Sequence, residues 1–70
     1  MINETDRAVR ALNSLENDLR RYRHQLQKAM VAAIQNDEMR EFNIIAAEVK
    51  GIDYAILLII EHRQRITEEK

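Results

Sequence analysis

The sequence predicts an all-α protein, an antiparallel two-helix hairpin that self-associates into a helical bundle. Two observations on composition favour long helices: the 70 residues include no Pro and a single Gly, the residues that most often interrupt a helix. The third observation is that apolar residues recur every three or four positions in both halves of the chain, the spacing of one helix face. A chain of this length forms a single domain, residues 1–70.

The first helix is expected over about residues 4–35. Asn3 is a suitable N-cap, and Glu4 and Asp6 follow it at the positive end of the helix dipole. The apolar residues of this helix have heptad spacing, which predicts the seam that packs against a partner helix. They are Ala8, Leu12, Leu15, Leu19, Tyr22, Leu26, Ala29 and Ala33.

A turn is expected at about residues 36–37, where Asn36 and Asp37 interrupt the periodicity. Asn adopts the left-handed conformation that ends helices, and Asp caps the helix that follows. The second helix is expected over about residues 38–67. Its seam residues are Phe42, Ile45, Val49, Ile52, Ile56, Ile59, Arg63 and Ile66. The alternative to a hairpin is one continuous helix of about 65 residues in a long coiled coil.

The second helix carries more apolar residues than one seam requires. The additional residues form a stripe that we expect to join chains: Ile44, Ala47, Gly51, Tyr54, Ala55 and Leu58. Three small residues in this stripe lie four positions apart, a spacing that lets helix backbones approach closely. A small hairpin with a single seam would also be marginally stable. The sequence therefore predicts a homo-oligomer, with a dimeric four-helix bundle favoured over a slightly apolar, unpartnered surface.

The outer face of the first helix is expected to be basic, although the net charge of the chain is −1. Guanidinium groups bind phosphate oxygens in a fork and Lys adds a point charge. Structured RNA, DNA or a nucleotide is therefore an alternative partner, and a solvated surface is the competing interpretation. The candidate phosphate-binding residues are Arg7, Arg10, Arg20, Arg21, His24 and Lys28.

The sequence offers no set of residues for catalysis, for a metal or for a cofactor. It has no Cys, its two His are far apart along the hairpin, and its single Ser has no base beside it. The longest apolar run, residues 55–60, is far shorter than the roughly 20 residues that cross a bilayer. With no recognisable signal peptide, we expect a cytoplasmic protein without a membrane partner.

Part of the second helix resembles the first helix of the all-helical chorismate mutases. In that family an arginine at the Arg63 position helps to hold the carboxylate of the substrate. The family also has an arginine about five turns upstream, where this chain has Ala46 and Ala47. We therefore expect no enzyme. The resemblance is carried by Ile52-Asp53-x-x-Ile56-Leu57-x-Ile59-Ile60-x-x-Arg63.

Two further resemblances concern the architecture of the whole chain. A two-helix chain with a basic outer face resembles the repressor-of-primer family of plasmid copy-number regulators, which are dimeric hairpins that bind RNA. Compact hairpins without Cys or Pro and with a polar Asn-Asp turn are also similar to small accessory proteins of tailed bacteriophages. The seam and the stripe of the second helix favour a non-enzymatic, self-associating assembly or interaction module, to which the second resemblance adds an expected phage origin. The alternative, favoured by the basic outer face of the first helix, is binding of phosphate-bearing ligands.

Overall fold

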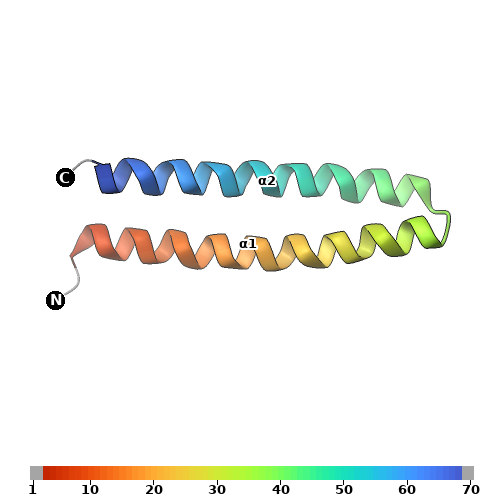
Figure 1. Ribbon diagram of the computed structural model, residues 1–70, viewed down its shortest axis with the longest axis horizontal. Coiled ribbons are helices and arrows are strands. Elements are labelled where there is room, and N and C mark those ends of the chain that lie inside the picture. Colours follow the sequence, from red (N-terminus) through yellow and green to blue (C-terminus); the bar gives the residue numbers. More distant parts are fainter. Residues whose placement is uncertain (1–2, 69–70) are drawn as a thin grey trace.

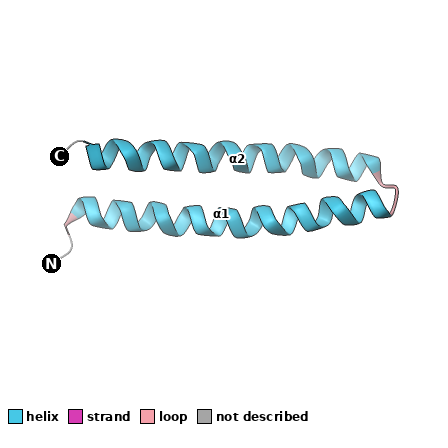
Figure 2. Cartoon of the chain, in the orientation of Figure 1, coloured by secondary structure: helices cyan, strands magenta, loops and turns pink. Residues whose placement is uncertain are grey.

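The computed structural model describes residues 3–68 and consists of two antiparallel helices joined by a short turn (Figure 1). Helix α1 spans Glu4–Gln35 and helix α2 spans Met39–Glu68. The helices lie side by side along their whole length (Figure 2), in a molecule 53 Å long, 19 Å wide and 10 Å thick. The predicted all-α hairpin is confirmed, and the alternative of one continuous helix is wrong.

Both ends of α1 are capped by local hydrogen bonds. Asn3 is the N-cap, as predicted, and its Oδ1 accepts a hydrogen bond of 2.8 Å from the backbone N–H of Asp6. At the other end, the N–H of Glu38 donates to the carbonyl of Ala33 at 2.8 Å. The left-handed residue is Asp37, with φ 59°, whereas Asn36 keeps φ −94°. The left-handed residue follows the C-cap because this geometry lets two backbone N–H groups reach the last free carbonyls of the helix.

The seam between the helices is thin. Four residues are buried in it, each with a few per cent of its surface still exposed, and the remaining seam residues are half-buried. All eight residues predicted for the seam of α2 are buried or half-buried, so this prediction is confirmed. In α1, Leu12, Leu19, Leu26 and Ala33 are confirmed in the same way. The four buried residues are Ala33, Ile45, Ile56 and Ile59.

Ala8 is also half-buried, as predicted, but three other residues of the predicted α1 seam are wrong by one position. Leu15 and Tyr22 are 49% and 47% exposed, and Ala29 is exposed as well. The seam positions beside them are occupied by Glu16, Arg23 and Met30. Both series lie three or four residues from Leu12, Leu19 and Leu26, so either is compatible with heptad spacing. The structure places Glu16, Arg23 and Met30 in the seam because α2 supplies partners for two of them: Arg63 for Glu16 and Asp53 for Arg23.

Candidate interaction surfaces

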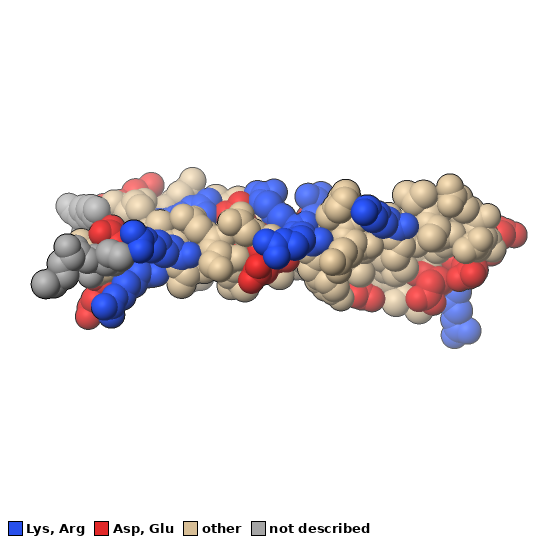
Figure 3. Space-filling view, turned by 90° about the horizontal axis from the view of Figure 1, so that it is seen from below, with Lys and Arg blue, Asp and Glu red and all other residues tan. Residues whose placement is uncertain are grey.

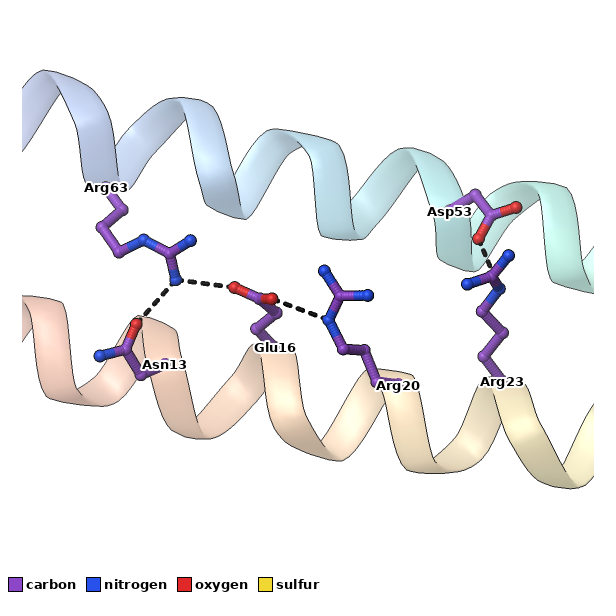
Figure 4. A network of polar contacts seen from close by, with 6 residues as sticks. All are labelled: Asn13, Glu16, Arg20, Arg23, Asp53 and Arg63. Atoms are coloured by element: carbon purple, nitrogen blue, oxygen red, sulfur yellow. Dashed lines mark hydrogen bonds and ion pairs between the residues drawn. The ribbon is translucent and has the colours of Figure 1, made fainter.

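One broad side of the hairpin carries a network of charged groups that links α1 to α2 (Figure 4). Glu16 lies at its centre, with only 14% of its side chain exposed. Its Oε2 accepts from Arg20 Nε at 2.8 Å, and its Oε1 accepts from Arg63 Nη1 at 2.7 Å. Arg63 Nη1 also donates to Asn13 Oδ1 at 2.7 Å. The hydrogen bonds from Arg20 and then Arg63 stabilise the carboxylate, so the pKa of Glu16 is lowered from its ordinary value.

A second cross-helix pair lies further along the same side. Arg23 Nε lies 2.8 Å from Asp53 Oδ1, although its N–H is not directed at a hydrogen-bond acceptor within the described residues. Asp53 is about half exposed, so the pair is partly screened by solvent. We call this broad side the polar side. It comprises Asn13, Glu16, Arg20, Arg23, Asp53 and Arg63.

The opposite broad side is apolar and is formed by both helices. Tyr22 of α1 reaches across it to α2, where its Oη lies 3.5 Å from Glu48 Oε2, a long hydrogen bond. Leu15 and Ala29 lie seven positions from Tyr22 and therefore share its side of α1, and Ile44 lies four positions before Glu48. We call this surface the apolar side. It comprises Leu15, Tyr22, Ala29, Ile44, Gly51, Ala55 and Leu58.

The predicted interface stripe lies mostly on the apolar side. Ile44 is 51% and Leu58 38% exposed, so neither is used by the seam of the hairpin. A Cβ atom built on Gly51 would meet nothing within 4 Å. Tyr54 and Ala47 lie beside these residues, on the surface of α2 that points away from α1. Sequence reasoning missed the contribution of α1, because its apolar residues on this side were assigned to the seam.

Large exposed apolar residues also occur outside the apolar side. Val31, Ile34 and Met39 are each more than half exposed near the turn. Leu57, four positions after Asp53, lies on the polar side of α2 and is 53% exposed. These residues lie near the turn or on the polar side, whereas the apolar side combines exposed residues of both helices.

The basic residues of α1 occupy its surface opposite α2, which we call the basic surface. Figure 3 shows this surface, with Lys and Arg extending from the N-terminal end past the middle and acidic residues interspersed among them and near the turn. Arg20 differs from the other candidates because it is bound to Glu16 on the polar side. The remaining five are exposed, and no ion pair joins any of them to another described residue. They are Arg7, Arg10, Arg21, His24 and Lys28.

The part of the chain that the structure describes, residues 3–68, encloses no cavity. His24 and His62 are both exposed, and no group of three potential metal ligands comes together within these residues. Neither helix has a stretch apolar enough to cross a membrane. The features available for function are therefore surfaces.

The fold and these surfaces define a helical hairpin with one apolar side, one polar side and a basic surface on α1. Comparison with known protein families, with curated proteins and with solved structures finds no match. The resemblances to phage accessory proteins and to repressor of primer therefore stay predictions.

Proposed function

We propose that this chain is a non-enzymatic interaction module that works by self-association, with a dimeric four-helix bundle as its basic unit. The observation that carries the proposal is the apolar side, where both helices expose large apolar residues. A helix that is apolar on two faces is stable in water when both faces are covered, and α2 has its seam face and its apolar side.

The thin seam supports the same conclusion. Within residues 3–68 no side chain is completely buried, and only four residues count as core. A chain of this size with one small core holds on the order of 3–5 kcal/mol at most, and small domains often gain the rest by oligomerisation. A second layer of helices on the apolar side would cover Leu15, Tyr22, Ile44 and Leu58 together.

Gly51 provides a second argument. A glycine inside a helix costs about 1 kcal/mol relative to alanine, and a Cβ at this position would fit within the hairpin. The hairpin itself therefore gains nothing from the missing side chain. The missing side chain would instead let another helix approach the apolar side closely.

The experiment compares two adjacent leucines that lie on different sides of α2. Leu58→Gln changes the apolar side, and Leu57→Gln changes a leucine on the polar side that is even more exposed, 53% against 38%. Native mass is measured by light scattering at micromolar concentration. We expect at least two chains for the parent and for Leu57→Gln, and a shift towards the 8.3 kDa monomer for Leu58→Gln. A folded parent that is monomeric at these concentrations contradicts the proposal.

The basic surface favours a second function, binding of phosphate-bearing ligands such as structured RNA or duplex DNA. Its guanidinium groups are exposed and have no acidic partner within the described chain, so they are free for phosphate. The test variant is Arg21→Glu/Lys28→Glu, and Arg40→Glu/Lys50→Glu on α2 is a control with the same change in charge. If the surface binds nucleic acid, the parent and the control bind at low salt and the test variant does not. A parent that binds neither RNA nor DNA at low salt eliminates this function.

A further inference from the structure

The apolar side has charges of opposite sign at its two ends. Glu41 lies in the first turn of α2, near the hairpin turn, and Arg65 lies in its last turn. Both are exposed. Glu41 is three positions before Ile44, and Arg65 is seven positions after Leu58, so each continues the apolar side. Glu48 adds a second acid to the half near the turn.

Two hairpins that meet through the same broad side have two symmetric arrangements, because a two-fold axis must lie in the plane between them. An axis parallel to the helices keeps both turns at one end and sets α1 on the α2 of the partner. An axis across the helices reverses the partner end for end. The second arrangement sets α2 on α2 and α1 on α1, each pair antiparallel.

Charge favours the end-for-end arrangement. Glu41 and Arg65 each lie 12 positions from Asp53, so an axis at the level of Asp53 brings Glu41 beside the partner's Arg65, and the contact occurs twice. The other arrangement sets Arg65 against the N-terminal part of α1 in the partner, whose Arg7 and Arg10 lie on the basic surface and not on the apolar side, so it does not provide this pair of opposite charges.

Side-chain size is compatible with the same arrangement at the residues nearest the axis. Arg23 and Asp53 lie 2.8 Å apart, so Tyr22 is close to the level of the axis and would lie beside the partner's Tyr22. Leu15 then faces the partner's Ala29, and Gly51 faces the partner's Ala55, each pair within one antiparallel contact. Pairing large with small residues and small with small lets two helix layers pack closely.

The broad side that carries these residues is 53 Å long and 19 Å wide. A second copy that covers its whole length meets an outline of about 1,000 Å², compared with roughly 800 Å² of accessible surface per partner in a standard interface. We propose that the apolar side binds a second copy of this chain end for end, so that each turn lies beside the free helix ends of the partner. This inference rests on the proposed self-association and specifies its geometry.

Disulfide trapping tests the geometry, because the chain contains no Cys. Glu41→Cys and Arg65→Cys are made separately, one with a tag that changes its mass, then mixed, equilibrated and oxidised. We expect a cross-link between the two variants in the mixture and none within either alone. Tyr22→Cys should link to itself, and Arg21→Cys, on the basic surface, should not.

Charge reversal provides a second measurement that does not depend on cross-linking. Glu41→Arg and Arg65→Glu should each weaken association about two- to five-fold, the usual range for an exposed pair, and the double variant should recover most of the loss. A monomeric parent overturns the self-association itself. A dimeric parent whose Glu41→Cys variant links to itself, or whose mixture does not link, overturns only the end-for-end geometry.

Discussion

Glu16 shows how a single residue can join the two helices. Its carboxylate accepts hydrogen bonds from Arg20 of its own helix and from Arg63 of the other. Arg63, a seam residue of α2, donates to Asn13 as well as to Glu16 and so extends the network along α1. A charged residue is stable at this seam position because each of its oxygens has a partner.

The lowered pKa of Glu16 makes the stability of the fold depend on pH. Because the pKa of Glu16 in the folded chain lies below its ordinary value of 4.5, the contribution of its carboxylate to the stability of the fold is complete above pH 4.5. It is lost as pH falls through the lower folded value. We expect the parent to lose thermal stability on acidification and Glu16→Gln to lose less of it, measured by circular dichroism. The exposed Glu68→Gln should behave as the parent, and an unchanged pH profile in Glu16→Gln would show that the network contributes nothing.

Gly51 gives a prediction with opposite effects on the helix and on association. Leu is a better helix former than Gly by nearly 1 kcal/mol, so the helix content of Gly51→Leu in dilute solution should be maintained or increased. On the apolar side the new side chain should separate two close helices, which commonly costs 1–3 kcal/mol. Helicity and native mass, measured across a dilution series, distinguish the two effects. A variant that keeps the oligomeric mass and melts higher places Gly51 outside the interface.

At the scale of the element, α1 carries two stripes that the structure assigns to different surfaces. Leu19 lies in the seam and Leu15 on the apolar side, although both belong to one apolar series in the sequence. Leu19→Gln should therefore destabilise the hairpin itself, since a polar group placed in an apolar seam costs roughly 1–3 kcal/mol. Leu15→Gln should leave the hairpin helical and weaken association. Urea unfolding at several protein concentrations separates these effects, and equal loss of helicity in both variants would contradict the assignment.

At the scale of the whole molecule, salt separates the two proposed functions. Association through the apolar side depends on apolar contact, so its dissociation constant should change little between low and moderate salt, apart from the small contribution of the charged ends. Binding of RNA or DNA to the basic surface should weaken steeply, because counterions are released when phosphates are neutralised. Sedimentation equilibrium and a binding titration at matched salt concentrations measure both. An association that weakens with salt as steeply as nucleic-acid binding would contradict contact through the apolar side.

Much of the fold follows from the sequence alone. The absence of Pro, the heptad series and the polar residues around Asn36 and Asp37 were sufficient to predict two helices, the turn between them and the N-cap at Asn3. The seam of α2 was predicted completely, because its isoleucines leave one strongly apolar face. The residues of the basic surface were also identified, with Arg20 as the exception, since its partner Glu16 is on the same helix but faces α2.

The rotation of α1 was decided only by the tertiary structure. Residues 15 and 16 differ by about 100° around the helix axis, yet both fit the heptad spacing of α1. The choice depends on Arg63 and Asp53, which α2 places beside Glu16 and Arg23. Hydropathy along one helix contains no information about charged partners on another. The composition of the apolar side was decided in the same way. The rotation of α1 that places Glu16 and Arg23 in the seam also places Leu15 and Tyr22 on the same side of the hairpin as Ile44 and Leu58.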